Sequence, residues 1–387
     1  MASIRKRTWK SKDRDGQPTE LTAWVVVYTA FDPKKKKERR FQETFATKKE
    51  AEAFKINTLH EVQRGTHTPA SISKTVVEAW EAWLDECKAN NLELGTILQR
   101  TQHLNLHVGP FIGHEKLSSL TVPRIHQFDA DLRNAGRSLS MRRKILVNVK
   151  TMLKFAQGRG WVTQNVAKSV TIKDDKRAAR GPLCEGVDFP SRTELKTMME
   201  AAPAKWRPLL VTAVFTGMRA SELRGLIWND VDLDAGIIHV RRRADTWKNM
   251  GDPKSKAGKR DIPLAPIVVN TLRQWREVCP KGELGIVFPN GRGNVETLTN
   301  IYRRFWTPLQ IKCGLTIDGG HRYGFHMLRH AAASLFIAYL GWTPKRVQTV
   351  MGHSSITMTY DRYGHLFESK DADREAMEKI EAAVTAA

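Results

Sequence analysis

The sequence predicts a mainly α-helical protein with small β-sheets, divided into three parts along the chain. The first 65 residues combine strand-like runs with one helix, the next hundred show only helical periodicity, and the segment from residue 187 mixes helices with short strands. With 387 residues, 41% of them hydrophobic, the chain can form two or three domains with hydrophobic cores of their own.

Residues 1–65 are expected to form a strand–strand–helix module. The run TAWVVVYTAF (22–31) is rich in β-branched and aromatic residues, and RFQETFAT (40–47) alternates apolar with polar residues, so the two predict a hairpin. Thr47 followed three residues later by Glu50 is typical of a capping box, which begins a helix that continues to the end of the module.

Residues 73–170 are expected to form a helical bundle. Four segments place apolar residues three and four positions apart: VVEAWEAWLDECKAN, TILQRTQHLNLHVGPFIG, TVPRIHQFDADLRNAG and LSMRRKILVNVKTMLKFAQGRG. The last segment carries five cations, Arg142, Arg143, Lys144, Lys150 and Lys154. Such a face suits contact with a phosphate backbone, although a solvated helix surface has the same composition.

The third domain is expected at 187–370. The charged and poorly patterned stretch TIKDDKRAARGPLCEG (171–186) predicts a linker before it, and residues 371–387 predict a tail helix after it. Ser191 and Glu194 make a second capping box at the start of this domain.

The net charge and the hydropathy of the chain indicate which classes of partner it can bind. The 63 Lys and Arg against 41 Asp and Glu give a formal net charge of +22, which favours nucleic acid first and an anionic membrane surface second. The KKKK run at 34–37 can contact phosphate or form a solvated turn. No apolar run approaches the roughly 20 residues of a membrane span, and MASIRKRTWKSK lacks a secretory signal's apolar region, so we expect a cytoplasmic protein.

The cysteines indicate free thiols. They are far apart and include no CxxC pair, so they predict neither a disulfide framework nor a cysteine zinc site: Cys87, Cys184, Cys279 and Cys313.

One helix-forming stretch, GFHMLRHAAASLF (324–336), begins with side chains that resist burial unless they have partners. His326 and Arg329 share one helical face, as do His326 and His330, so the start of this helix predicts an anionic partner. The second pair also has the spacing of zinc ligands. Without the Glu of HExxH and a nearby third ligand, however, this pattern favours phosphate over a metal.

Two other pieces of the third domain place cations at the ends of elements. In FTGMRASELRGL (215–226), Arg219 follows a helix-breaking Thr-Gly pair and can fork onto two phosphate oxygens, or else pair with Glu222 on the surface. GIIHVRRR (236–243) and KRDIPL (259–264) predict two strands joined by a polar turn, and a turn lysine there can enter a groove and deliver a proton.

The last piece, VMGHSSITMTYDRYGHLF (350–367), holds His353 after a glycine turn and two tyrosines, Tyr360 and Tyr363, on the short helix that follows. A tyrosine near a helix end is often a half-buried packing residue. In this chain, however, the two tyrosines follow three other segments whose side chains can bind phosphate.

The order of these pieces resembles the catalytic signature of tyrosine recombinases, the phage integrase family. The resemblance extends over the whole chain and implies an arm-type DNA-binding module at 1–65, a core-binding domain at 73–170 and a catalytic domain at 187–370. It implies the following site residues: Arg219, Lys256, His326, Arg329, His353 and Tyr363.

The resemblance also implies roles for these residues. Arg219, Arg329 and His326 would stabilise charge on a DNA phosphate, and Tyr363 would attack phosphorus to leave a 3′-phosphotyrosine and a free 5′-hydroxyl. His326 is the candidate base and His353 a donor to the phosphate. Lys256 would protonate the departing 5′-oxygen, with Lys254 as the alternative.

Three further expectations concern Glu222, Tyr360 and the partners. Glu222 is expected to orient neighbouring donors, and Tyr360 is the alternative nucleophile. The resemblance implies no metal, nucleotide or other cofactor. It implies double-stranded DNA as the partner, a homotetramer on synapsed sites, and accessory DNA-bending or directionality factors in a cytoplasmic, nucleoid-associated setting.

Three other functions compete with a recombinase. A type IB topoisomerase shares the Tyr, Arg, Lys and His chemistry, and a regulator could keep the fold without cutting DNA. The complete set of six positions argues against the regulator, and the N-terminal module with the long basic bundle favours the recombinase over the topoisomerase. A membrane-surface protein would need a basic amphipathic helix with an aromatic face, which the sequence lacks.

Overall fold

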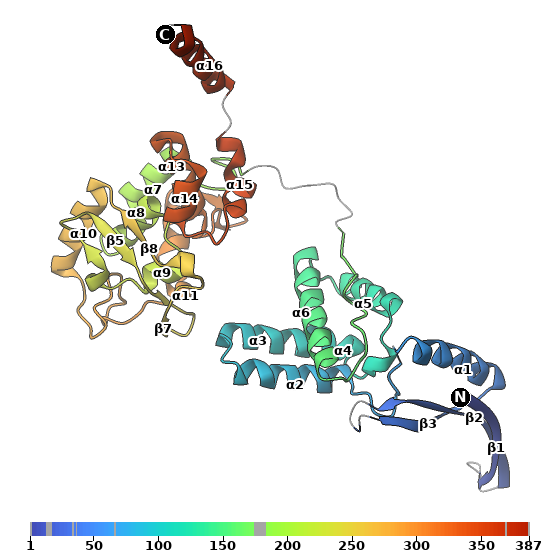
Figure 1. The fold of residues 1–387 in the computed structure, drawn as a ribbon. Helices are drawn as coiled ribbons and strands as arrows, with labels where there is room; N and C mark the ends of the chain where they lie inside the picture. Colours follow the sequence, from blue (N-terminus) through green and yellow to red (C-terminus); the bar gives the residue numbers. More distant parts are fainter. Residues whose placement is uncertain are drawn as a thin grey trace. The chain divides into compact units, whose positions relative to one another are not determined.

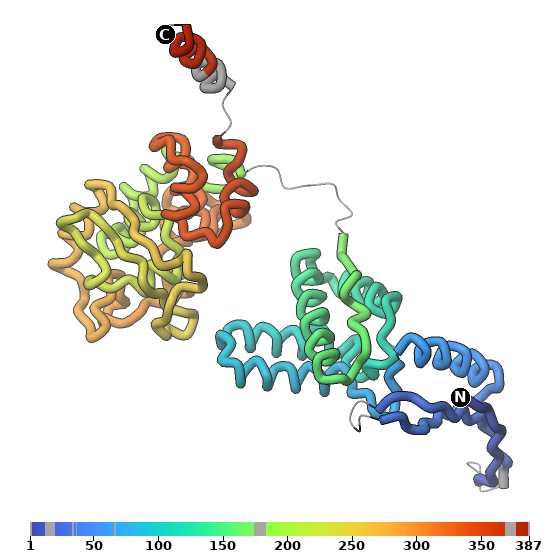
Figure 2. Tube along the Cα trace, viewed as in Figure 1, coloured from blue at the N-terminus to red at the C-terminus, as the bar shows by residue number. Residues whose placement is uncertain are grey.

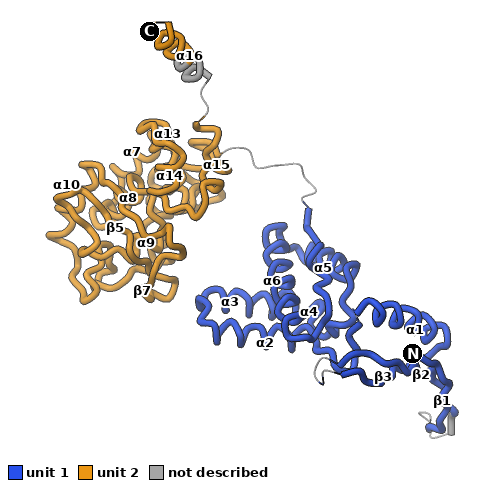
Figure 3. The backbone as a smooth tube through the Cα atoms, viewed as in Figure 1, with its two compact units in different colours: residues 1–177 blue, residues 178–387 orange. Residues whose placement is uncertain are grey.

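The chain divides into two compact units, residues 1–177 and 178–387 (Figure 3). The computed structural model describes residues 2–12, 18–32, 35, 37–65, 67–173, 183–367 and 370–385. Two lysines of the KKKK run, at 34 and 36, and most of the predicted linker lie outside the described residues.

Unit 1 begins with an antiparallel sheet of order β1–β2–β3, followed by one helix (Figure 1). The bounds are β1 (Ala2–Lys12), β2 (Pro18–Asp32), β3 (Lys37–Phe45) and α1 (Lys48–Gln63). The predicted hairpin is β2–β3, with Trp24 opposite Phe45, and the capping box of Thr47 and Glu50 is confirmed at the start of α1. The sequence did not predict β1, because this mostly exposed, basic strand lacks the apolar alternation that marks one.

Helices make up the rest of unit 1. Their bounds are α2 (Val76–Ala89), α3 (Leu94–His103), the π-helix η1 (Leu104–Val108), α4 (Gly109–Ile112), the 3₁₀ turn η2 (Leu117–Ser119), α5 (Val122–Asn134) and α6 (Leu139–Gly158). Segments α3, η1 and α4 follow one another directly and occupy one predicted helix. Trp80, Ile125, Phe128 and Ile145 are almost fully buried where these helices meet, so the periodic apolar positions face a shared core.

Unit 2 mixes helices with short strands. The bounds of its elements are α7 (Arg192–Ala201), α8 (Arg207–Thr216), α9 (Ala220–Arg224), η3 (Trp228–Asp230), β4 (Val231–Asp232), β5 (Ile237–Val240), β6 (Arg243–Ala244), β7 (Met250–Gly251), η4 (Lys256–Gly258), β8 (Arg260–Pro263), α10 (Pro266–Val278), α11 (Leu298–Ile301), η5 (Tyr302–Trp306), α12 (Thr307–Lys312), β9 (Thr316–Ile317), β10 (Gly320–His321), α13 (Met327–Leu340), α14 (Pro344–Met351), α15 (Thr357–Tyr363), η6 (Gly364–Leu366) and α16 (Lys370–Thr385). The capping box of Ser191 and Glu194 is confirmed at the start of α7.

The predicted strand pair of unit 2 is present, but its connection is longer than a turn. Strands β5 and β8 pair antiparallel with Ile238 opposite Ile262, in a sheet of order β4–β5–β8. Between them the chain forms a second ladder, β6–β7, in which Arg243 lies opposite Gly251. The lysines at 254 and 256 therefore follow β7 on the return to β8, and do not lie at the tip of a simple hairpin.

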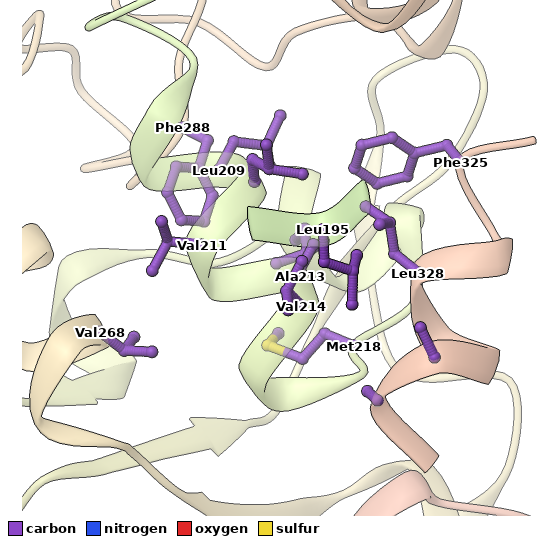
Figure 4. Packing of buried hydrophobic residues seen from close by; sticks show 14 of the residues in the cluster. Leu195, Leu209, Val211, Ala213, Val214, Met218, Val268, Phe288, Phe325 and Leu328 are labelled. Atoms are coloured by element: carbon purple, nitrogen blue, oxygen red, sulfur yellow. The ribbon is translucent and has the colours of Figure 1, made fainter. Parts of the chain in front are cut away.

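Helix α8 runs through the centre of unit 2. Its residues 208–214 are all buried, as expected for a helix that is apolar on every side. Figure 4 shows Leu209, Val211 and Val214 of this helix among buried side chains of neighbouring elements. Helices α10 and α13 both pack against α8, and Figure 2 shows the chain of α13, far along the sequence, returning beside it. None of the helices in the described residues is long and apolar enough to cross a lipid bilayer.

A buried ion pair joins three segments next to α8. The Arg260 guanidinium, on β8, donates to both carboxylate oxygens of Glu222, on α9, at 2.9 and 3.2 Å. The same guanidinium donates to the Val350 carbonyl of α14 at 2.6 Å and to the Gly258 carbonyl at 2.9 Å. Both side chains are about 97% buried. Each guanidinium nitrogen of Arg260 thus donates to a protein acceptor, which is the condition under which a buried charge is tolerated.

The environment of Glu222 fixes its ionisation. Burial disfavours the carboxylate, but the Arg260 charge and hydrogen bonds outweigh burial and, with Arg219, lower the pKa of Glu222 to about 2. The folded-state pKa is below the ordinary value of 4.5, so this carboxylate contributes stability that is complete above about pH 4.5 and is lost as the pH falls towards 2.

Replacing the carboxylate should therefore destabilise unit 2 in a pH-dependent way. We expect Glu222→Gln to lower the free energy of unfolding by roughly 3 kcal/mol at pH 7, because the substitution leaves the buried Arg260 charge without its partner. Urea titration followed by hydrogen exchange in α8 should show the difference from the unsubstituted protein shrinking between pH 4.5 and 2. The control Glu200→Gln alters an exposed pair with Lys196 and should stay within about 0.5 kcal/mol. Equal stability of Glu222→Gln and the unsubstituted protein at pH 7 would contradict this account.

Candidate functional site

A cleft of about 860 Å³ in unit 2 brings together side chains from five separate segments of the chain. Five of the six predicted site residues line it: Arg219, His326, Arg329, His353 and Tyr363. They come from the start of α9, the first turn of α13, the loop after α14 and the end of α15. The packing of α8, α13, α14 and α15 thus brings Arg219 and Tyr363 to one surface.

Two glycines allow these segments to approach closely. Gly217 ends α8 with a φ of 61°, and a Cβ there would lie 2.8 Å from the Met351 sulfur. Gly352 ends α14 with a φ of 66°, and a Cβ there would lie 2.9 Å from the Ala257 carbonyl oxygen. Both positions therefore require glycine for conformation and for space.

Arg219 lies at the first residue before α9, where Glu222 holds it. Its guanidinium donates to Glu222 at 2.8 Å and to the Gly352 carbonyl at 2.9 Å, while its backbone N–H donates to Glu222 at 2.9 Å. The side chain remains 32% exposed towards the cleft that it lines. Arg219 therefore pairs with Glu222, as one expectation had it, but Glu222 is buried and Arg219 still faces an open cavity. The predicted orienting role of Glu222 agrees with these contacts.

Arg329 is the more deeply buried cation. Its guanidinium donates to the Gly217 carbonyl at 2.8 Å and also to the Met351 carbonyl, so the two glycine turns position it. Burial, together with the Arg219 charge, lowers the pKa of Arg329 to about 9. The group therefore remains mostly cationic at neutral pH. Two adjacent cations beside an open cleft are a receptor for a tetrahedral anion.

The three histidines of the cleft are held in their neutral form. Burial and the nearby arginines lower the pKa of His353 to about 3, and the Nδ1 atom of His353 lies 2.9 Å from the Thr359 hydroxyl. Burial and His326 lower the pKa of His330 to about 4. Desolvation, Arg329 and Arg219 also lower the pKa of His326. The lowered pKa values leave all three rings unprotonated at pH 7 and make His330 and His353 weak bases in the unliganded protein.

Tyr363 projects its hydroxyl into this group although it is 99% buried. Its Oη lies 2.7 Å from the Nδ1 atom of His330, and its ring is nearly parallel to that of His353 with centroids 6.5 Å apart. Burial raises the pKa of Tyr363 to about 12, although Arg329 and Arg362 act in the opposite direction. The alternative tyrosine, Tyr360, is 51% exposed and contacts Phe367.

The sixth predicted residue, Lys256, lies apart from this group. It is exposed at the start of η4 and is not among the residues that line the cleft. Lys254, the alternative, lines an adjoining cavity of about 310 Å³ together with Arg219, Ser221 and Arg243. Lys254 thus shares a cavity with Arg219, and its position follows from the β6–β7 ladder that the sequence did not predict.

Two residues of this arrangement were missed as site residues by sequence reasoning. Arg260 was read only as part of a strand, although its two-residue spacing from the inward-facing Ile262 places it on the buried face. His330 was considered only as a metal ligand with His326. No group of three His, Cys, Asp or Glu side chains that could hold a metal occurs in the part of the chain that the structure describes.

Comparison with known proteins finds two family models that match this chain. Residues 191–370 match the model described as "Phage integrase family", and residues 75–132 match "Phage integrase, N-terminal SAM-like domain". The chain is 25% identical to the prophage integrase IntR of Escherichia coli strain K12 over 264 residues, which are 62% of this chain and 61% of that relative.

Solved structures share the fold. The Tn1549 transposon integrase in complex with transposon right end DNA superposes with a TM-score of 0.66 at 21% identity, covering 80% of this chain and 100% of the other. A lambda integrase tetramer bound to a Holliday junction superposes with a TM-score of 0.57 at 19% identity, covering 90% of this chain and 96% of the other. With a matching family model over the unit that holds the cleft and another over the helical bundle, the chain belongs to the phage integrase family of tyrosine recombinases.

Proposed function

We propose that this protein is a site-specific DNA recombinase, an integrase that cuts DNA through a covalent link to Tyr363 and rejoins the broken strand to a new partner. The observation that carries the proposal is the position of the Tyr363 hydroxyl, which lies in one cleft with three arginines and three histidines. Family membership and the formal charge of +22 support double-stranded DNA as the substrate.

The cations account for catalysis at a DNA phosphate. A phosphodiester repels nucleophiles, and negative charge accumulates on its non-bridging oxygens as the transition state forms. Arg219 and Arg329 are already fixed by Glu222 and by backbone carbonyls, so they need little reorganisation when the phosphate binds. Attack by Tyr363 conserves the bond energy as a 3′-phosphotyrosine, and the freed 5′-hydroxyl of another strand can reverse the step.

A type IB topoisomerase would share this cleavage chemistry but would not join two different sites. Family membership and the bundle match at 75–132 favour recombination. Incubation with a plasmid that lacks any target site separates the two, since a topoisomerase would relax its supercoils and a recombinase would leave it unchanged.

The target duplex can be recovered with the protein itself. The protein is incubated with fragmented DNA of the genome that encodes it, the mixture is denatured, and the covalently attached ends are sequenced. These ends define the core duplex, which is the short sequence at which the adduct forms. Absence of any covalent adduct from the unsubstituted protein would contradict the proposed function.

Loss of the nucleophile's oxygen should abolish cleavage and spare binding. We expect Tyr363→Phe to bind the core duplex with unchanged affinity and to form no adduct on a denaturing gel, because only the hydroxyl is removed. The matched control Tyr360→Phe, at an exposed position three residues away, should form the adduct normally. An adduct with Tyr363→Phe that is absent with Tyr360→Phe would assign the nucleophile to Tyr360.

Cleavage should not depend on a divalent metal. The cations that we assign to the phosphate are the Arg219 and Arg329 side chains, so adduct formation on the core duplex should proceed at the same rate in excess EDTA as without it. Loss of cleavage in EDTA that Mg²⁺ or Zn²⁺ restores would overturn this part of the mechanism.

The departing 5′-oxygen needs a proton, which we assign to the lysine segment before β8. The cavity beside Arg219 supports Lys254 for this role, whereas the family pattern pointed to Lys256. Lys254→Ala should slow cleavage by roughly 10²–10⁴-fold, and Lys256→Ala should have little effect. A core duplex with sulfur at the bridging 5′ position needs little protonation, so it should restore the rate of Lys254→Ala but not that of Arg219→Ala. If Lys256→Ala cleaves slowly and the sulfur-containing duplex restores its rate, Lys256 is the proton donor instead.

Assembly on DNA is proposed to use the tail helix. Helix α16 presents Met377, Ile380 and Val384 at helical spacing, all exposed, and such a stripe can dock on a neighbouring copy in a tetramer. The tetrameric arrangement of the lambda integrase supports this proposal. Binding to chromosomal sites would place the protein at the nucleoid, where DNA-bending or directionality factors could act with it.

The tail should therefore matter for pairing two duplexes. We expect Ile380→Asp to weaken formation of the two-duplex complex at least tenfold in a gel-shift assay, with single-site binding unchanged, since a charge would be buried in the interface. Glu378→Asp, a conservative change on the same helix, serves as the control. Normal pairing by Ile380→Asp would leave α16 as a solvated terminal helix.

A further inference from the structure

Among the residues that the structure describes, His330 alone makes a hydrogen-bonding contact with the Tyr363 hydroxyl. The Nδ1 atom lies 2.7 Å from Oη, and the two ring centroids are 5.8 Å apart. His330 comes directly after Arg329 on α13, a helix that packs against the central α8. The imidazole that contacts the nucleophile is therefore fixed by the same helix that positions a phosphate-binding arginine.

The other two histidines of the cleft have different partners. The ring of His326 packs edge-on against the ring of His330 at 5.4 Å and an interplanar angle of 89°. His353 places its Nδ1 atom 2.9 Å from the Thr359 hydroxyl and only stacks on the tyrosine ring. Within the described residues, neither has a hydrogen bond to Tyr363. The sequence-based choice of His326 as the base is therefore less well supported by the contacts than His330.

The local environment keeps the His330 ring unprotonated, although the same burial and charges make it a weak base until an anionic phosphate offsets the nearby arginines. Burial, His326, Arg362 and Arg329 together disfavour a second proton on His330, so the ring is neutral before the reaction. A neutral ring whose Nδ1 faces a phenol accepts the hydroxyl proton when the other nitrogen carries the ring's own proton. Buried Tyr363 is a poor nucleophile until that proton leaves.

We propose that His330 is the general base of this recombinase, taking the Tyr363 proton during strand cleavage and returning it during rejoining. The inference rests on the proposed function. In cleavage the Tyr363 O–H bond breaks and the proton moves to Nδ1 of His330 as the tyrosine oxygen bonds to phosphorus. The bond from phosphorus to the 5′-oxygen breaks, and that oxygen receives its proton from the lysine segment. Rejoining reverses each transfer.

The test changes the acidity of the nucleophile instead of relying on loss of activity alone. Single-turnover adduct formation on the core duplex is measured for the full-length protein and for His330→Ala. Each is prepared with ordinary tyrosine at position 363 and with a ring-fluorinated tyrosine, whose phenol ionises near neutral pH. The control is His239→Ala, on β5, whose Nδ1 pairs with Asp261 away from the cleft.

With ordinary tyrosine, His330→Ala should form the adduct roughly 10²–10⁴-fold more slowly than the unsubstituted protein. With the fluorinated tyrosine the two should differ by less than about tenfold, because little proton removal remains. His239→Ala should match the unsubstituted protein throughout. Such rescue cannot come from a residue that only supports the fold, because phenol acidity does not repair packing.

Three results would overturn the assignment. An unchanged rate for His330→Ala would remove His330 from the chemistry, and a faster rate would mean that the contact holds Tyr363 in a resting position. A slow variant that the fluorinated tyrosine does not rescue would limit His330 to a structural role. If the proposed function itself is wrong, the unsubstituted protein forms no adduct with either tyrosine. That outcome differs from all three results above.

Discussion

The ion pair between Glu222 and Arg260 is the constraint on which the geometry of the cleft depends. Through it, the start of α9, the strand β8 and the end of α14 share one set of hydrogen bonds, although they lie far apart in the sequence. Glu222 also holds Arg219, which in turn reaches the Gly352 carbonyl beside His353. A buried carboxylate thus positions a cation of the main cleft without lining that cleft itself. The contribution of such a pair is to fix geometry, since a buried pair adds little net stability over apolar packing.

The rest of the cleft follows from placing two arginines close together, with Arg329 buried and Arg219 partly exposed. Arg219 and Arg329 repel each other, and the protein offsets this repulsion with backbone carbonyls at Gly217, Met351 and Gly352. Burial, reinforced by neighbouring cations that include Arg329, keeps His330 and His353 neutral, and a neutral ring is the form that can take a proton from a phenol. A phosphate entering the cleft would relieve the repulsion between the arginines. Substrate binding and activation of the nucleophile therefore use the same charges.

Much of this arrangement could be predicted from the sequence. The order of Arg219, the HxxR pair, His353 and Tyr363 identified residues that are separated by up to 144 positions and yet line one cavity. Local signals also fixed where α1 and α7 begin, because a capping box depends only on residues three apart. The predictions failed where structure depends on pairing across the chain. Strand β1 is held by β2 and not by its own apolar pattern, and the placement of Lys254 depends on the β6–β7 ladder.

The partners of buried polar atoms are similarly beyond sequence reasoning. Nothing local shows that Arg260 reaches Glu222, or that the histidine after Arg329 reaches a tyrosine 33 residues later. The most direct measurement of the central claim is mass spectrometry of the trapped protein–DNA adduct after digestion with protease and nuclease. The account predicts a single nucleotide-bearing peptide with the 3′-phosphate on Tyr363. A nucleotide attached to Tyr360, or to any other residue, would contradict it.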